Sequence, residues 1–320
     1  MHMADALVSA AVGGSFWALS GGALAGCSRR LRRDEDERRV PLMGVLGAFV
    51  FAVQMVNFAI PGTGSSGHLV GTLLLSALLG PPAAVLVMGS VLLVQALFFA
   101  DGGLLAFGCN LFNMGILPAF VAYPLVYRPL ARRGHPAAGA ILGAVAALQL
   151  GALAVVLETV LSGLAGLPFR AFLLAMLPIH LPIGLAEGLA TALLLRFVRR
   201  ARPGLLEERP EPAGRRLLAV GLGAAVLTAG VLSWAASRRP DGLEWSVARV
   251  APAGAAAPEG FVHRLAARIQ GRTSVLPDYA LPGAGGDPRG GTSLAGLLGG
   301  AATLALVAGA GWLAARRGRS

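Results

Sequence analysis

The feature that most constrains this chain is a series of apolar runs, each about as long as a membrane-crossing helix. Such a helix needs about 20 apolar residues to cross roughly 30 Å of hydrocarbon. Nine runs can be drawn along the 320 residues, at roughly 5–27, 41–60, 66–80, 82–100, 109–127, 137–161, 171–197, 216–236 and 294–314. Only 13% of the residues are charged, well below the share in a soluble domain. The sequence therefore predicts an all-α, polytopic membrane helical bundle.

The basic charge of the chain has two possible explanations. All 27 basic residues are arginine, and the net charge is +11, as in chains that bind nucleic acid or contact membranes. Aromatic residues make up only 6% of the chain and 45 residues are glycine, which favours close helix packing over base-stacking surfaces. Cys27 and Cys109 are too few for a disulfide framework or a thiolate metal site. We therefore exclude a disordered protein, a disulfide scaffold and a typical DNA-binding domain, and we expect no nucleic-acid partner.

The placement of the arginines predicts an orientation. Nine spans put four arginine-rich segments on one face, with 19 arginines at 28–40, 128–136, 196–216 and the C-terminal tail. The short connections on the other face hold one, Arg170. Because arginine-rich loops stay in the cytoplasm, we expect the N-terminus outside and the C-terminus inside a bacterial cytoplasmic (inner) membrane. The run ending at Cys27 resembles a lipoprotein cleavage site, but its charge cluster follows the apolar run, so we expect the N-terminus to be retained.

The chain is predicted to divide into two parts. Residues 1–198 form a compact block of seven helices with short loops, and residues 199–214, rich in Pro, Glu and Arg, form a cytoplasmic linker. Residues 215–320 hold two further transmembrane helices. These bracket an outward segment at 237–293, which is rich in Gly, Pro and Ala, and we expect this segment to be loosely ordered.

The first residues, Met1-His2-Met3, can form a metal chelate. A bulky second residue usually blocks removal of the initiator Met, so we expect Met1 to keep a free α-amine. This amine, the backbone nitrogen of His2 and the His2 Nδ1 can close fused chelate rings around one metal and leave a fourth planar position open. Ni²⁺ and Cu²⁺ prefer such all-nitrogen ligation. The alternative is a histidine at position two by chance.

A second imidazole can take the fourth position. The outward connection at 57–68 ends in His68 and contains Pro61, Gly62, Gly64 and Gly67, which allow a tight backbone. A loop of this kind lies at membrane depth only where protein covers it or where it lines a cavity. His68 is then either a ligand or a solvated histidine at the membrane interface. The N-terminus is expected on the same face, which favours a shared site.

Four blocks of this sequence closely resemble one family of transport components. They are MHMADALVS at 1–9, NFAIPGTGSSGHLVG at 57–71, VQALFFADGGLLAFGCNLFNMG at 94–115 and IHLPIGLAEGLAT at 179–191. Together they resemble the nickel/cobalt substrate-capture component (CbiM/NikM type) of energy-coupling-factor transporters over about residues 1–200. The run Pro240-Asp241-Gly242-Leu243-Glu244 resembles the PDGLE signature of the small companion component (CbiN/NikN type). The chain therefore looks like a fusion of the two components.

The resemblance implies a metal site and partners. In the family, the N-terminal amine, the amide and imidazole of residue two and the histidine of the glycine-rich loop hold the metal, and these correspond to Met1, His2 and His68. Ni²⁺ or Co²⁺ is then the transported substrate, and no cofactor is permanently bound. The family's energy comes from two ATPase subunits and a transmembrane coupling subunit. This chain has no GxxxxGK[ST] loop, so it cannot itself hydrolyse ATP as a P-loop enzyme. The resemblance thus implies a high-affinity capture component that is not an enzyme.

Other polar residues have weaker assignments. Candidates for hydrogen bonds to the imidazoles are Asn57, Ser65, Ser66 and Asn110, although capping is an alternative for the serines. Asp101 either attracts cations or caps a turn, and Glu158 is expected near solvent. Cys109 is expected to be a packing residue, and His135 and His263 are expected in loops. His180 and Glu187 share one helix face and either contact metal or make structural contacts.

Two rival functions stay open at this point. An ion-coupled secondary metal transporter could use His180 and Glu187 as a proton relay. A membrane protease or transferase is the other rival, although the chain has no matched nucleophile and base. Uptake driven by a proton gradient without any ATPase would favour the first rival.

Overall fold

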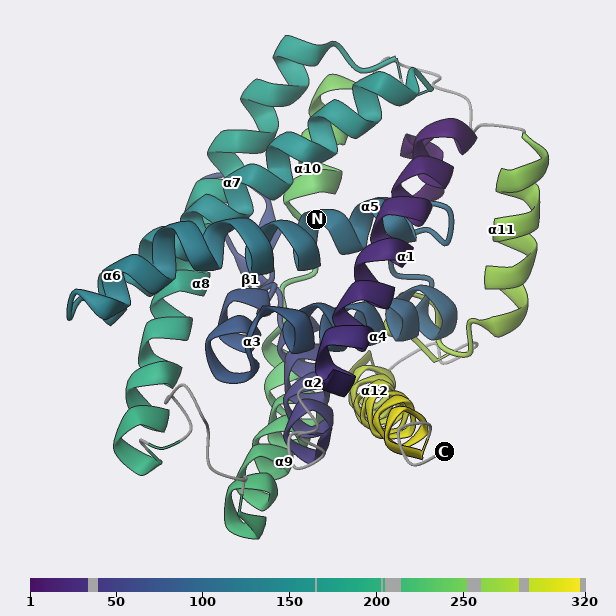
Figure 1. Ribbon diagram of the computed structural model, residues 1–320. Coiled ribbons are helices and arrows are strands. Elements are labelled where there is room, and N and C mark those ends of the chain that lie inside the picture. The colour runs from purple at the N-terminus through teal and green to yellow at the C-terminus, as the bar shows by residue number, and fades with distance from the viewer. Residues whose placement is uncertain are drawn as a thin grey trace.

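The protein is a bundle of helices, as predicted. The computed structural model describes residues 1–33, 40–164, 166–202, 204, 214–251, 260–281 and 288–316. Within these ranges, seven helices are long and apolar enough to cross a membrane. They are α1 (Ala10–Arg33), α4 (Pro81–Phe99), a continuous helix from α5 (Phe107–Leu111) through η3 (Phe112–Ile116) and η4 (Pro118–Tyr127) to α6 (Arg128–Arg132), α7 (Pro136–Ser162), α8 (Phe169–Ala201), α9 (Arg215–Gly230) extended by η6 (Leu232–Ala235), and α12 (Pro288–Arg316). Figure 1 shows their arrangement.

The prediction of a third span at 66–80 is wrong. The second run forms α2 (Val40–Gln54), a 15-residue apolar helix, but the third forms only α3 (Thr72–Leu79), whose eight residues extend about 12 Å at 1.5 Å each. The residues before α3 belong to a loop with a two-stranded antiparallel ribbon, β1 (Phe58–Ala59) and β2 (Ser66–Gly67). The side chains of α3 are almost all buried. Its apolar character therefore reflects burial inside the protein, which hydropathy alone cannot tell from lipid contact.

The segment at 237–293 is more ordered than expected. It contains α10 (Gly242–Val250), α11 (Phe261–Thr273) and the short turn η7 (Pro277–Tyr279), while residues 252–259 and 282–287 lie outside the described residues. Helix α10 begins with a capping box in which Asp241 accepts the amides of Leu243 and Glu244. Of the expected linker, residues 203 and 205–213 also lie outside the described residues, and its first residues continue α8 to Ala201.

Small residues allow the helices to pack closely. Helices α7 and α8 form an antiparallel pair, and a Cβ at Gly188 would lie only 2.5 Å from the Cα of Ile141. In the C-terminal part, a Cβ at Gly299 of α12 would overlap the Phe51 ring of α2. Glycine at such positions lets transmembrane backbones approach each other. Helices α9 and α12 thus pack against α2, as Figure 1 shows, and the C-terminal part is joined to the first block.

The N-terminus lies inside the bundle. Residues 1–9, including the short turn η1 (Asp5–Leu7), precede α1, and the N label in Figure 1 lies among α5, α3 and α10. Met1 is 4% exposed and Met3 is fully buried. The first residues are thus placed among side chains from helices far along the chain.

Candidate metal centre

Contacts of Met1 with α7 and of Met3 with Asn110 hold the first residues in place. The Met1 side chain packs against Gly151 of α7, where a Cβ would lie 3.1 Å from the Met1 Cε. The Met3 amide donates to the Asn110 Oδ1 at 2.7 Å, and the Asn110 Nδ2 donates to the Met3 carbonyl at 3.1 Å. The amide of Gly103 donates to the same carbonyl at 2.8 Å. These contacts on both sides of His2 fix the backbone that the chelate would use.

The loop that carries His68 is tied to two helices. Glu187 of α8 accepts the amides of Val70 at 2.8 Å and Gly71 at 3.0 Å, one with each carboxylate oxygen. Gln54, at the end of α2, donates to the Val70 carbonyl at 2.8 Å. Gly71 has φ +85°, a conformation that glycine adopts without strain. The position of His68 is therefore set mainly by α8, and Glu187 serves as the anchor.

The expected ligands converge. The Met1 amine lies 3.3 Å from the His68 Nε2. The His2 and His68 rings are stacked, with centroids 5.0 Å apart and planes 20° from parallel. Burial lowers the pKa of both imidazoles below the usual 6.5, and the nearby Met1 amine lowers them further. Both rings are thus kept neutral, the state that binds metal.

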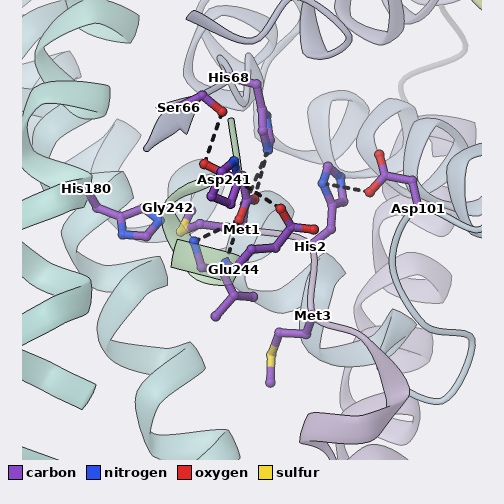
Figure 2. A network of polar contacts seen from close by, with 12 residues as sticks. Met1, His2, Met3, Ser66, His68, Asp101, His180, Asp241, Gly242 and Glu244 are labelled. Atoms are coloured by element: carbon purple, nitrogen blue, oxygen red, sulfur yellow. Dashed lines mark hydrogen bonds and ion pairs between the residues drawn. The ribbon is translucent and has the colours of Figure 1, made fainter. Parts of the chain in front are cut away.

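His2 makes two polar contacts beyond the chelate. Its Nε2 lies 3.1 Å from the Gln95 Oε1, and its Nδ1, the atom that the chelate needs, faces the Asp101 carboxylate at 3.4 Å (Figure 2). Asp101 in turn accepts a hydrogen bond from the Tyr279 hydroxyl. Asp101 therefore orients the His2 ring. The sequence suggested cation attraction or turn capping for Asp101, and neither role includes a contact with His2.

Asp241 is the site residue that sequence reasoning missed. Its Oδ2 lies 2.9 Å from the Met1 amine and 4.0 Å from the His68 Nε2. Burial opposes its ionisation, but the charged Met1 amine and the hydrogen bond donated by the Glu244 amide outweigh this effect and hold the pKa of Asp241 well below its usual range. The PDGLE run was visible in the sequence as a family signature. Nothing in the sequence indicated that its aspartate faces the N-terminus.

The four predicted imidazole partners have other roles. Asn110 holds the Met3 backbone, and the Asn57 carbonyl accepts the amide of Ser237 at 2.7 Å. Ser65 and Ser66 donate to backbone carbonyls of the PDGLE segment, Ser66 to Arg239 at 2.7 Å. Within the described residues, the polar groups around the His2 and His68 rings are instead Gln95, Asp101, the Leu69 carbonyl, the Met1 amine and Asp241. The serines thus join the His68 loop to the C-terminal part.

The remaining candidates separate into different places. Glu158 is buried and accepts from Asn113 at 2.7 Å, so the expectation of a solvated Glu158 is wrong. Cys109 is buried and free, as a packing residue would be. His263 lies in α11 and not in a loop, with its Nε2 2.9 Å from the Val8 carbonyl. His135 lies in the exposed turn before α7.

His180 and Glu187, both on α8, make separate contacts near the His68 loop. Glu187 has both oxygens occupied by backbone amides, so it acts as an anchor. His180 is buried beside Gly242 of the PDGLE run (Figure 2). In the part of the chain that the structure describes, no three His, Cys, Asp or Glu side chains are grouped to hold a metal. The Met1 amine and the His2 backbone nitrogen are therefore the further candidate donors beside the imidazoles.

Two family models together match most of the chain. The family model described as cobalt uptake substrate-specific transmembrane region matches residues 2–205, and the model of the PDGLE domain matches residues 215–316. A relative from Archaeoglobus fulgidus, whose name includes fused nickel transport protein NikMN, is 35% identical over 96% of both chains. The fused nickel transport protein NikMN of Rhodobacter capsulatus is 36% identical over 79% of this chain and 80% of its own.

Further matches cover the first block. The cobalt transport protein CbiM of Sorangium cellulosum is 38% identical over 56% of this chain and 81% of its own. The crystal structure of a truncated transition metal transporter superposes with a TM-score of 0.57 and 30% identity, covering 63% of this chain and 99% of that one. The chain therefore belongs to the family of cobalt uptake substrate-specific transmembrane proteins, fused here to a PDGLE domain, and is a nickel/cobalt transport component.

Proposed function

We propose that this chain captures Ni²⁺ or Co²⁺ through the Met1 amine, the backbone nitrogen and Nδ1 of His2, and the Nε2 of His68. The observation that carries the proposal is the 3.3 Å separation of the Met1 amine and the His68 Nε2, next to the stacked His2 ring. Neutral imidazoles, an amine and a backbone nitrogen are all nitrogen donors. Planar nitrogen ligation favours nickel by coordination preference.

Capture proceeds by displacement of protons. Before binding, the protonated Met1 amine pairs with Asp241. The cation must replace a proton on this amine and another on the His2 backbone nitrogen, while the His2 ring turns its Nδ1 from Asp101 toward the metal. Asp241 then remains beside the bound cation as a compensating charge. This contact supports a role for the PDGLE part in loading metal, which we include in the proposal.

The cation is expected to enter from outside the cell. We propose that the chain lies in the cytoplasmic membrane, with its N-terminus outward and its C-terminus in the cytoplasm. The C-terminal ends of α1, α6 and α8 and the start of α9 carry arginine groups and lie away from α11 in Figure 1, which supports this orientation. Residues 1–198 are the capture block, 199–214 the linker and 215–320 the companion part.

The energy for uptake is proposed to come from other subunits. These are two ATPases and a transmembrane coupling subunit, with which the chain forms an energy-coupling-factor transporter, and the chain itself is not an enzyme. Capture is of high affinity because four ligands close around one ion. The support is the family membership and the resemblance of the four sequence blocks.

The test is a nickel titration of the purified full chain, read by absorption spectra of planar Ni²⁺. Gln-Pro inserted between Met1 and His2 keeps a bulky second residue, so Met1 is retained, and it separates the amine from the His2 imidazole by a proline that has no amide hydrogen to lose. This insertion should abolish the planar nickel spectrum. Gln-Pro inserted after Gly134, in the exposed turn before α7, is the matched control and should leave the spectrum intact. An unchanged spectrum in the first variant would refute the chelate.

A further inference from the structure

His180 of α8 has one ring nitrogen that the fold leaves without a partner. The side chain is 1% exposed. Its Nδ1 lies 2.7 Å from the Met176 carbonyl, one turn earlier in the helix. Its Nε2 is buried and has no hydrogen-bond partner among the described residues. Buried polar atoms are seldom left unpaired, so this nitrogen requires an explanation.

The carbonyl contact determines which nitrogen carries the proton. A carbonyl only accepts, so Nδ1 must be the N–H donor and Nε2 must hold the free lone pair. Histidines that bind metal are commonly arranged in this way, with the other ring nitrogen donating to a backbone carbonyl or carboxylate. The imidazole of His180 is thus prepared as a ligand and not as a donor.

The free nitrogen faces the candidate metal centre. His180 lines the same small cavity as Met1, His68 and Asp241, and Figure 2 shows its ring directed toward Gly242 and the Met1 side chain. The other lining side chains, Val70, Leu148 and Ile183, are apolar and offer no hydrogen-bond donor. Of the chemical species that the proposed function brings here, the cation is the one that a neutral imidazole nitrogen binds best.

Gly242 keeps the edge of the imidazole accessible. A Cβ on Gly242 would lie 3.0 Å from the His180 Cε1 and 3.2 Å from its Nε2. A larger residue would cover the nitrogen or push α10 away from it. This contact accounts for the glycine between Asp241, which binds the amine, and Leu243, which is buried.

Two prolines weaken the hydrogen-bond ladder of α8 around His180. Pro178 and Pro182 flank His180 within the helix, and each lacks the amide that would continue the hydrogen-bond ladder. The same helix holds the His68 loop through Glu187. A bend at the prolines would therefore shift His180 relative to His68.

We propose that the His180 Nε2 is a further ligand for the transported cation and binds it together with His68 as the bonds to Met1 and His2 are lost. The inference rests on the proposed function. The exchange changes ligands only, since the amine and the backbone nitrogen recover their protons from water as the cation leaves them. His180 thus provides a second position for the cation, one that the N-terminal chelate does not include.

The test uses the purified full chain with Ni²⁺ and the His2→Ala substitution, which disables the chelate. Calorimetry should find weakened but measurable binding by His2→Ala, and adding His180→Ala should lower the affinity at least tenfold further. Adding His135→Ala, which removes an exposed imidazole, should have no such effect. No residual binding by His2→Ala, or equal binding by the double variant, would overturn the inference.

Two replacements of His180 distinguish a ligand from a structural side chain. In the His2→Ala background, His180→Cys offers a thiolate and should restore binding with a sulfur-to-nickel absorption band. His180→Gln retains hydrogen-bonding groups but is a poor ligand and should not restore binding. Rescue by Gln and not by Cys would indicate a structural role. Loss of the planar spectrum by insertion after Met1 tests the proposed function separately, so either proposal can fail alone.

Discussion

The carboxylate of Asp241 lies 2.9 Å from the amine of Met1, although the two residues are 240 positions apart. Asp241 belongs to the PDGLE part, and Met1 belongs to the capture block. Asp241 also caps α10, so one side chain holds both the helix and the N-terminus. The fused part thereby contributes directly to the centre where the metal is proposed to bind.

Asp241→Asn should slow nickel capture more than it weakens binding. Asn still caps the helix and still accepts a hydrogen bond, but it no longer attracts cations. Loss of two protons on binding offsets the two charges of Ni²⁺, so the electrostatic effect on the equilibrium is small. The association rate at low salt should fall about three- to tenfold. Stopped-flow measurements at several salt concentrations check this, and an unchanged rate with the same salt dependence would contradict it.

Glu187→Gln should weaken nickel binding about tenfold, which corresponds to about 1.4 kcal/mol. The carboxylate accepts two amides of the His68 loop, and hydrogen bonds to a charged acceptor are stronger than neutral ones. Gln would accept only one, and His68 would lose its fixed position. Glu158→Gln is the matched control, since Glu158 is also a buried carboxylate but contacts Asn113. Equal losses in both variants would argue against the anchoring role.

The pH dependence should show two protons released per Ni²⁺ near neutral pH. The amine and the His2 backbone nitrogen each lose one, whereas the imidazoles are already neutral because their pKa values are lowered below 6.5. Protons compete for the imidazoles only at lower pH, where the release should rise above two. Calorimetry in buffers of different ionisation enthalpy counts these protons. A value near one at pH 7 would exclude the backbone nitrogen as a ligand.

Gly188→Ala should destabilise the bundle by about 1–3 kcal/mol, the usual cost of overpacking. The new methyl group would lie 2.5 Å from the Cα of Ile141, a backbone atom that cannot turn aside. Gly223→Ala, on α9, has open space around the added methyl and should leave the Tm unchanged. Thermal unfolding in detergent measures both, and equal Tm values would contradict the close packing of α7 and α8.

The helical fold follows from the sequence because a run of about 20 apolar residues is typical of a helix that crosses a membrane. The exception is α3, where apolar side chains are buried by protein, and hydropathy cannot separate that case from lipid contact. The sequence predicts a loose segment at 237–293 because its composition is rich in Gly, Pro and Ala. The order of its first part, at 237–251, comes from contacts with Ser65, Ser66 and Met1, which lie far away in the sequence.

The candidate ligands follow from local chemistry, since Met1 and His2 can form a chelate by their adjacency and the glycine-rich loop offers His68 on the same face. The resemblance to a known family implies the same set. The supporting contacts of Gln95, Asp101 and Asp241 were not predictable, because each depends on where a distant helix end packs. The sequence shows Glu187 as a carboxylate within an apolar span, but its role becomes visible only in the packing of α8 on the His68 loop.

The most direct test of the account counts and identifies the nitrogen donors around the metal. The full chain can be loaded with one equivalent of Cu²⁺, which shares the planar preference of Ni²⁺, and examined by electron paramagnetic resonance. The account predicts a planar signal from four nitrogens, which changes when the protein contains ¹⁵N-labelled methionine, because Met1 supplies its amine. A signal that is insensitive to this label, or one dominated by oxygen ligands, would contradict capture by the N-terminal chelate.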